Sequence, residues 1–353
     1  MPSGMNLVLF YAPVGGEGAW RSSGNGVEQL DSLDGPRNVA TKAKRAKLDA
    51  ILLADVLVYG GSGVEPDVDG NEPVTLMVAL AAVTEHIGLV ATLSTIFCEP
   101  HHVARQISGA DYLSNGRAGW NVVTSRVGGV NFGGELFQVQ GPMIVPRSPQ
   151  GRPVLFQAGQ SEEGRVFAAK WADVVFTAQT DIELARAFRT DMRDRLIRVG
   201  RDAEHFNVLP GVSFIFGDTL DDAERMEVEL LRLEGGEHRI PDLAKELGGI
   251  DLSDLTLDDP IPPNRLIDPK DAVNADIRDR SLFFEGSTSR YPNLYRAAAS
   301  GAPIARLMRL SGGHLTLVGT PLHVAQAMGR WYQEGACDGF STVHAGGPRS
   351  VFR

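Results

Sequence analysis

Short runs of Val, Ile, Leu and Phe alternate along the chain with longer segments in which apolar residues recur every three or four positions. The short runs predict buried strands, and the longer segments predict amphipathic helices. Strands are expected at Asn6 to Tyr11, Asp49 to Asp55, Ile87 to Thr95, Arg117 to Ser125, Pro153 to Gly159, Ala172 to Thr177, Phe206 to Gly217 and Asp338 to Val343. Helices are expected at Asn38 to Lys47, Val74 to Glu85, His102 to Leu113, Ser161 to Trp171, Asp181 to Val199, Leu220 to Leu233 and Pro321 to Glu334.

The repeated order of strand and helix favours parallel strands joined by right-handed crossovers. Eight such units predict an α/β fold of the closed (β/α)8 TIM-barrel type. An open, doubly wound sheet is the alternative. We expect a single domain over residues 1–353, a length sufficient to bury a large core.

Two of the expected units look incomplete. No helical pattern lies between the strand that ends at Ser125 and the strand that begins at Pro153. The last strand is followed only by a Gly-rich stretch, where a barrel places a closing helix. Either these units are shortened, or residues are missing from the sequence near 126–135 and 341–350. We favour missing residues, because a unit without its helix leaves strands uncovered on their outer face.

Residues 234–318 show the opposite irregularity, an insertion before the last helix-strand unit. Within the insertion, Asp251 to Pro269 is rich in Pro and acidic residues and predicts no single regular element. Closing segments of enzymes are commonly built from such excursions. We therefore interpret residues 234–318 as a cap or lid near the barrel mouth.

Four of the expected strands end in polar or small residues. They close on Asp55, on Thr92 with Ser94, on Asn121 with Ser125, and on Gly159 followed by Ser161. The carboxyl ends of barrel strands meet at one mouth, where the chemistry of this fold takes place. Taken singly, a helix cap or ordinary turn chemistry is the alternative for each residue. Taken together, four polar ends at one rim indicate a binding site.

The stretch from Gln157 to Gly164 predicts a site for an anion. A strand ends there, Gly159 allows close backbone approach, and Ser161 begins a helix whose first amide groups attract phosphate. Glu162 and Glu163 suit the helix dipole, but they repel a phosphate unless their side chains point away.

Charge and composition narrow the classes of function. The chain has 34 basic and 44 acidic residues, a net charge of −10, and no run of Lys and Arg that could follow a nucleic-acid backbone. Cys98 and Cys337 are too few for a disulfide framework and indicate buried thiols in a reducing compartment. There is no signal-peptide pattern, and the longest apolar run is about half a membrane span. We expect a cytoplasmic protein that binds neither nucleic acid nor a membrane.

The sequence offers little for hydrolytic or metal chemistry. It lacks Gly-x-Ser-x-Gly and His-Glu-x-x-His, and no Gly-x-Gly-x-x-Gly follows the first strand. His101 and His102 have only Glu99 as a nearby carboxylate, so we interpret them as a helix start and expect no metal site. Trp20, Trp120 and Trp171 are interpreted as core or wall residues.

The string from Ala110 to Ser125, ADYLSNGRAGWNVVTS, resembles the signature of the bacterial-luciferase-like flavin monooxygenases. Within that family it is most similar to the nitrilotriacetate, EDTA, dibenzothiophene-sulfone and long-chain-alkane monooxygenases. Other stretches match in the family's order over nearly the whole chain: Ala19 to Arg21, Leu53 to Asp55, Glu72 to Leu76, Gly141 with Pro142, Pro146 to Pro153, Gln157 to Ser161, Val318 to Pro321 and Asp338 to Phe340. The resemblance implies a (β/α)8 barrel that binds FMN at the strand carboxyl ends.

The resemblance also implies roles for individual residues. Contacts to the FMN ring or phosphate are implied for Asp55, Thr92, Ser94, Asn121, Ser125, Gly159 and Ser161. Independently of the resemblance, Phe10, Tyr11, Phe97 and the 234–318 insertion are expected at the mouth, where they would shape a substrate pocket. The chain lacks the family's His-Asp-x-Arg-Tyr segment after the fourth strand and the His that precedes Ala-Trp-Arg. The roles of that Tyr and that His are therefore not carried over.

The activity that the resemblance implies is two-component monooxygenation. A separate NAD(P)H:flavin reductase supplies reduced FMN, and a C4a-hydroperoxyflavin formed with O2 inserts one oxygen atom into a small organic substrate. The protein orients the flavin and excludes water, which fits the lack of a nucleophilic triad. A deazaflavin-dependent oxidoreductase and a non-catalytic flavin-binding protein are the alternatives. We expect a homodimer or homotetramer, and the substrate stays open.

Overall fold

The computed structural model describes residues 4–11, 32–55, 71–95, 98, 100–123, 148–233, 235–268, 290–311 and 313–343. Its strands are β1 (Asn6–Tyr11), β2 (Ala50–Leu53), β3 (Gly88–Ser94), β4 (Ala118–Val123), β5 (Val154–Ala158), β6 (Val174–Thr177), β7 (Asn207–Phe216), β8 (Leu315–Gly319) and β9 (Gly339–Val343). Its helices are α1 (Asp34–Arg45), α2 (Pro73–Val83), α3 (Pro100–Leu113), α4 (Glu162–Trp171), α5 (Ile182–Arg198), α6 (Leu220–Leu233), α7 (Ile240–Glu246), α10 (Arg290–Ala299), α11 (Ile304–Ser311) and α12 (Pro321–Gln333), with short 3-10 turns η3 (Gly236–Arg239) and η4 (Pro263–Arg265). Each expected strand and helix is present, with its ends shifted by a few residues at most.

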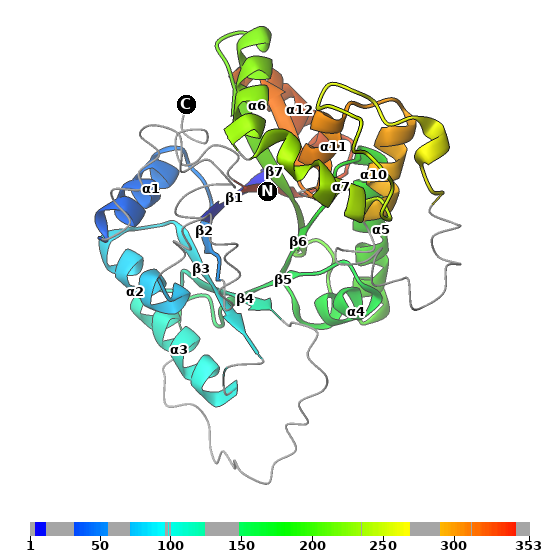
Figure 1. Cartoon of the computed structure of the whole chain (residues 1–353). Coiled ribbons are helices and arrows are strands. Elements are labelled where there is room, and N and C mark those ends of the chain that lie inside the picture. Colours follow the sequence, from blue (N-terminus) through cyan, green and yellow to red (C-terminus); the bar gives the residue numbers. More distant parts are fainter. Residues whose placement is uncertain are drawn as a thin grey trace.

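Eight strands form a closed parallel ring in the order β1, β2, β3, β4, β5, β6, β7 and β9, with β9 pairing back to β1. In the middle of β1, Val8 is in register with Ala50 on one side and with Ser341 on the other. Figure 1 shows the helices arranged outside this ring. The (β/α)8 barrel is confirmed, and the open sheet is excluded.

Alternate residues of each strand face the barrel interior, as the strand period of two requires. The interior core consists of Val8, Ala50, Leu52, Val90, Phe156, Val174 and Leu209. Residues at the intervening positions, such as Leu9, Ile51 and Leu89, belong to a core shared with helices α1, α2 and α3. Burial on both faces explains why the strands read as continuous apolar runs rather than as alternating patterns.

Strand β8 corrects the sequence-based assignment, which placed Leu315 to Val318 inside an irregular insertion. β8 pairs with the second half of β7, from Val212 with Leu315 to Phe216 with Gly319. This pairing is possible because β7 is longer than β6, which covers only the first part of β7, up to Pro210. β8 takes the edge that β6 leaves open, a pairing between segments about a hundred residues apart that local sequence does not reveal.

The segment between α6 and β8 has a hydrophobic core of its own. This core contains Leu231, Ile240, Leu243, Leu247, Leu252, Ile261, Tyr291, Leu294, Ala298, Ile304, Leu307 and Met308. Arg296 on α10 pairs with Asp181, the N-cap of α5, at 3.3 Å, and Figure 1 shows α10 beside α5. From residue 251 to residue 268 the chain forms only the short turn η4 and one isolated bridge, so no long regular element occurs there. The lid role of the insertion stays a prediction.

The first half of the string ADYLSNGRAGWNVVTS anchors the amino end of β4. The guanidinium of Arg117 donates to three carbonyl oxygens where α2 ends and β3 begins, and its burial lowers the pKa of Arg117. Asp111 Oδ1 accepts hydrogen bonds from the Ala118 N–H at 3.2 Å and from Gln150 Nε2 at 2.6 Å. Gly116, with a φ of +79°, turns the chain between these two anchors. These residues are structural.

The two incomplete units cannot be followed in the structure. Residues 124–147 and 344–353 lie outside the described part of the chain. The interpretation that residues are missing from the sequence there stays a prediction.

Candidate active site

A buried polar pair lies in the carboxyl half of β3 and β4. Thr92 and Asn121 are in register, and Asn121 Nδ2 donates to Thr92 Oγ1 at 3.1 Å. They share the interior face with Val90, and Ser94 is two residues further toward the mouth on the same face. All three predicted polar residues are at most 7% exposed. The structure therefore brings Thr92, Ser94 and Asn121 together, as expected from their strand positions.

Asn121 has an unsatisfied acceptor. Its Oδ1 atom is buried and has no hydrogen-bond partner among the described residues. A buried amide oxygen without a partner costs free energy, so it needs a donor from water or a ligand. A ring N–H group of a flavin is a donor of the required kind. The residues present at this point fit a flavin ring.

An aromatic wall faces the same interior. The Phe10 ring on β1 stacks on the Phe176 ring on β6 at 6.1 Å, and Phe176 contacts the His314 ring at 5.4 Å. His314 lies over Gly211 on β7, where any Cβ atom would overlap the imidazole. Sequence analysis singled out Phe10 but missed Phe176 and His314. The signal for Phe176 was its interior position on β6, whereas His314 depends on the unforeseen strand β8.

One other predicted residue, Tyr11, is placed differently, and two lie outside the described part of the chain. Tyr11 is 7% exposed and belongs to the core between the strands and the helices, because neighbouring residues of β1 point to opposite faces. It is therefore directed away from the interior that Phe10 faces. Phe97 and Ser125 lie outside the described residues.

Asp55 follows the end of β2 by two residues and is partly buried. A role as cap of the next helix was the alternative interpretation. That cap is Glu72, whose carboxylate accepts from the Val74 and Thr75 N–H groups at 3.0 and 2.6 Å. Asp55 does not cap α2, and a contact to the cofactor stays a prediction.

The start of α4 is a helix N-terminus at the carboxyl end of β5. Ser161 is the N-cap residue, and its exposed hydroxyl accepts from the Gly164 N–H at 3.2 Å. The Gln157 side chain packs so closely behind this turn that a Cβ atom on Gly159 would lie 2.5 Å from Gln157 Nε2. Gln157 Oε1 is buried without a partner among the described residues. The Gln157 amide is the movable end of a side chain and could give way to such a Cβ atom, and the turn presents its amide groups at the helix start.

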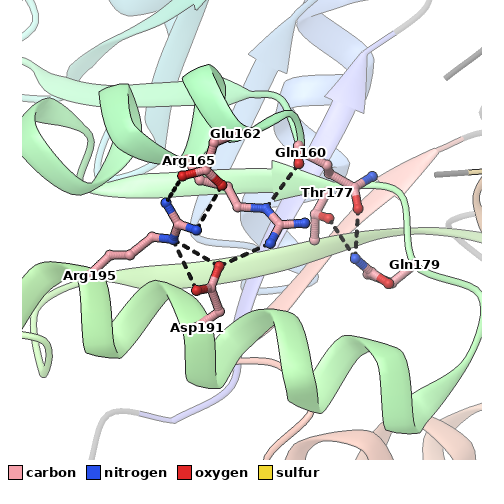
Figure 2. Close-up of polar contacts among 7 residues, drawn as sticks. All are labelled: Gln160, Glu162, Arg165, Thr177, Gln179, Asp191 and Arg195. Carbon is pink, nitrogen blue, oxygen red and sulfur yellow. Dashed lines mark hydrogen bonds and ion pairs between the residues drawn. The ribbon is translucent and has the colours of Figure 1, made fainter. Parts of the chain in front are cut away.

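A network of two arginines and two acids holds this turn, as Figure 2 shows. Arg195 on α5 pairs with both carboxylate oxygens of Glu162, at 2.7 and 2.8 Å, and with Asp191 at 2.9 Å. Arg165 pairs with Asp191 at 3.0 Å and donates from Nε to the Gln160 carbonyl at 2.9 Å. The Glu162 side chain is therefore turned toward α5, the outcome that an anion site at this turn requires.

The protonation states in the network follow from these contacts. Hydrogen bonding to Arg195 lowers the pKa of Glu162 and, in return, raises the pKa of Arg195. Burial acts to raise the pKa of Asp191, but hydrogen bonds from Arg195 and Arg165 outweigh it and lower that pKa overall. At neutral pH the four groups carry two positive and two negative charges.

A chain of amide groups fixes the other side of the turn. Gln160 donates from Nε2 to the Ala178 carbonyl at 3.1 Å, and its Oε1 accepts from Gln179 Nε2 at 2.7 Å. Gln179 also contacts the Thr177 hydroxyl at 3.3 Å (Figure 2). Sequence analysis missed Arg165, Arg195 and Gln179, because each also bonds to a residue 19 to 33 positions away in the sequence.

Other candidate groups do not form a second site. His101 and His102 lie in the first turn of α3, as expected, with ring centroids 6.4 Å apart. In the described ranges no group of three or more His, Cys, Asp or Glu side chains could hold a metal ion. Trp120 donates from Nε1 to the Leu93 carbonyl at 3.3 Å, but Trp171 is 60% exposed, so its assignment to the core or wall was wrong. Trp20 lies outside the described residues.

Cys98 and Cys337 are both free, with Cys337 buried and Cys98 partly buried. None of the helices that the structure describes combines the length and apolar character needed to cross a membrane.

Comparison with known proteins defines the class of this barrel as an oxygenase. The sequence matches the family described as luciferase-like monooxygenase over residues 14–127 and 126–338. The chain belongs to this family of flavin-dependent enzymes, and the resemblance seen in the sequence is confirmed.

Individual relatives agree with this assignment. N-acetyl-S-(2-succino)cysteine monooxygenase of Bacillus subtilis (strain 168) is 34% identical over 396 residues, covering 96% of this chain and 87% of its own. Nitrilotriacetate monooxygenase component A of Aminobacter aminovorans is 32% identical over 420 residues, covering 98% and 89%. The structure of EDTA monooxygenase from Chelativorans sp. BNC1 shares the fold, with a TM-score of 0.77, 24% identity, and coverage of 99% of this chain and 91% of that chain. Both sequence alignments are longer than the 353-residue chain, so these relatives carry residues with no counterpart here.

Proposed function

We propose that the protein is the oxygenase component of a two-component monooxygenase that binds reduced FMN at the barrel mouth. The observation that supports this best is the start of α4, a helix N-terminus whose first carboxylate, Glu162, is paired with Arg195 of α5. It lies at the carboxyl end of β5, the strand next to β4 with its polar residue Asn121. The start of α4 suits the phosphate of a flavin, and Asn121 suits its ring, so both parts of one flavin would find complementary groups at one end of the barrel.

The proposed contacts divide between the two parts of the cofactor. The amide groups at the start of α4 and the Ser161 hydroxyl would hold the phosphate. Asn121, Thr92 and Ser94 would hold the polar edge of the ring from the interior face of β3 and β4. We further propose Asp55, Ser125 and Gly159 as cofactor contacts on the strength of the family resemblance. When bound, the reduced flavin supplies the activation of O2 for insertion of one oxygen atom into a small organic substrate.

The protein itself would orient the flavin and the substrate and exclude water from them. Phe10, Phe176 and His314 form an aromatic wall that suits an apolar part of a substrate. Phe97 and the insertion are proposed to complete the pocket. No protein nucleophile is needed for this chemistry. We propose that a separate NAD(P)H:flavin reductase supplies the reduced FMN and that the chain works as a homodimer or homotetramer in the cytoplasm.

An anaerobic titration with photoreduced FMN tests the proposal. We expect saturable binding, followed on admission of air by an absorbing flavin transient that oxidised FMN alone does not give. In a coupled assay with a reductase and NADH, the amount of O2 consumed in the presence of a substrate should exceed the amount of peroxide released. Binding of a deazaflavin with hydride transfer and no O2 consumption would identify the deazaflavin alternative, and bound but inert flavin would identify a carrier.

A further inference from the structure

We propose that Arg195 is a positioning residue that makes the start of α4 receptive to a doubly charged phosphate. It does so by pairing with Glu162 and so removing a negative charge from the helix N-terminus. The inference rests on the proposed function, since the phosphate is that of the flavin. Among the described residues, Arg195 lies on α5 and pairs with Glu162 of the turn and with Asp191 of its own helix.

The first turn of α4 has opposing electrostatic demands. Glu162 and Glu163 are its first two residues, and carboxylates at this position stabilise a helix through its dipole. The same charges oppose a phosphate that approaches the amide groups of that turn. A phosphate site at this helix start therefore needs the carboxylates paired or directed away.

Arg195 meets this need for Glu162. Two of its nitrogens face the two carboxylate oxygens, the planar geometry in which arginine binds a carboxylate most strongly. The Arg195 side chain is 16% exposed, whereas that of Glu162 is 65% exposed. The arginine is thus the fixed member of the pair, and the carboxylate is drawn to it.

Asp191 fixes Arg195 before any ligand arrives. It lies one helical turn earlier on α5 and accepts from Arg195 Nε with both oxygens, at 3.0 and 2.9 Å. Asp191 also accepts from Arg165, whose Nε holds the Gln160 carbonyl next to Ser161. Figure 2 shows Arg195 reaching from α5 to Glu162 while Arg165 reaches from α4 to Gln160. The network therefore sets both the charge and the shape of the turn.

Comparing FMN with riboflavin isolates the effect of charge, because the two ligands share a ring and differ by the phosphate. We expect Arg195→Ala to weaken binding of reduced FMN by about five- to tenfold at low ionic strength. Binding of reduced riboflavin should change by less than about twofold, and added salt should reduce the loss for FMN. The double variant Arg195→Ala/Glu162→Gln should recover most of the FMN affinity, because the Glu162 charge is then removed and Asp191 keeps its pair with Arg165.

Arg198→Ala is the matched control. Arg198 is an exposed arginine in the last turn of the same helix and donates to the Asp194 carbonyl. Its removal changes the net charge by the same amount and should leave both ligands unaffected. Thermal unfolding of each variant shows whether the fold survives.

Three results would overturn the inference. Equal weakening of FMN and riboflavin would make Arg195 a structural residue only. Failure of Glu162→Gln to restore binding would show that the Glu162 charge is not the cause. An Arg195→Ala variant with the parent affinity for FMN would show that the pairing is irrelevant. A parent protein that binds neither flavin contradicts the proposed function itself, which is a separate outcome.

Discussion

Arg189 on α5 and Asp338, just before β9, form an ion pair of 2.7 Å between Arg189 Nη2 and Asp338 Oδ1. The other oxygen of Asp338 accepts from the Val208 N–H at the start of β7, at 2.9 Å. One carboxylate thus ties the last barrel strand to its neighbour and to a helix outside both. The stretch Asp338 to Phe340 is one of those that resemble the family, and these contacts show that its aspartate has a structural role.

We expect Asp338→Ala to lower the free energy of unfolding by about 2–4 kcal/mol, because it leaves a partly buried arginine and a backbone N–H without their acceptor. Urea denaturation measures the loss. Glu334→Ala, which breaks two more exposed pairs, with Arg330 and with Arg186, is the control and should cost far less. Equal losses of stability in the two variants would refute the role of Asp338 as a stabilising link between β7, β9 and α5.

Ser161→Asp should weaken FMN binding by about tenfold while leaving the melting temperature near that of the parent. Aspartate caps a helix about as well as serine, so the change adds charge without removing the cap. Fluorescence titration with FMN measures the effect. An unchanged dissociation constant would remove the phosphate from the start of α4.

Asn121→Ala should weaken reduced FMN and reduced riboflavin alike, by about tenfold, because the proposed contact is to the ring. This pattern is the reverse of the one expected for Arg195→Ala. Asn207→Ala, which removes an amide bonded to Asn6 at the amino end of the barrel, is a matched control with no expected effect on either ligand. Loss of FMN binding alone in Asn121→Ala would contradict a ring contact.

Asp55→Ala should melt near the parent temperature but bind reduced FMN more weakly and release more peroxide per NADH in a coupled assay. Glu72→Ala provides the contrast, since loss of the α2 cap should cost about 1 kcal/mol with normal flavin binding. If Asp55→Ala unfolds early yet couples O2 to product as the parent does, the predicted cofactor contact is wrong.

Cys337 should resist a thiol reagent in the native protein at pH 8, whereas Cys98 reacts. Burial raises the pKa of the Cys337 thiol to about 12. The folded pKa lies above the unfolded one, so its contribution to stability is complete below the unfolded pKa and is lost as pH rises toward 12. Cys337→Ala should therefore flatten the alkaline loss of stability, measured by urea unfolding from pH 8 to pH 11. Fast labelling of both thiols in the native state of the parent would contradict this.

The barrel could be predicted from the sequence because its signals are local. Apolar runs of strand length and helical spacing fall within a few residues of β1 through β7, and Leu220–Leu233 was assigned to the residue. β8 was not predicted, because it is a strand only through its pairing with the distant strand β7. Tyr11 was misplaced because the rule of alternation was not applied beyond Phe10.

Those residues of the candidate site that lie on strands could be predicted from the sequence. Thr92 and Asn121 could be placed together, since strand position and register decide their face. The orientation of Glu162 could not, because it depends on an arginine 33 positions away on another helix. His314 likewise reaches the interior only through a distant strand pairing.

The segment from α6 to β8 leaves the barrel and returns to it at nearly one place, because α6 and β8 pack against each other. A loop whose two ends are held together can gain or lose residues at small entropic cost and without moving the strands that carry it. The segment can therefore diverge as a module. Exchanging residues 235–311 between members of the family should transfer the fold of that segment while the eight strands and their polar residues stay as they are.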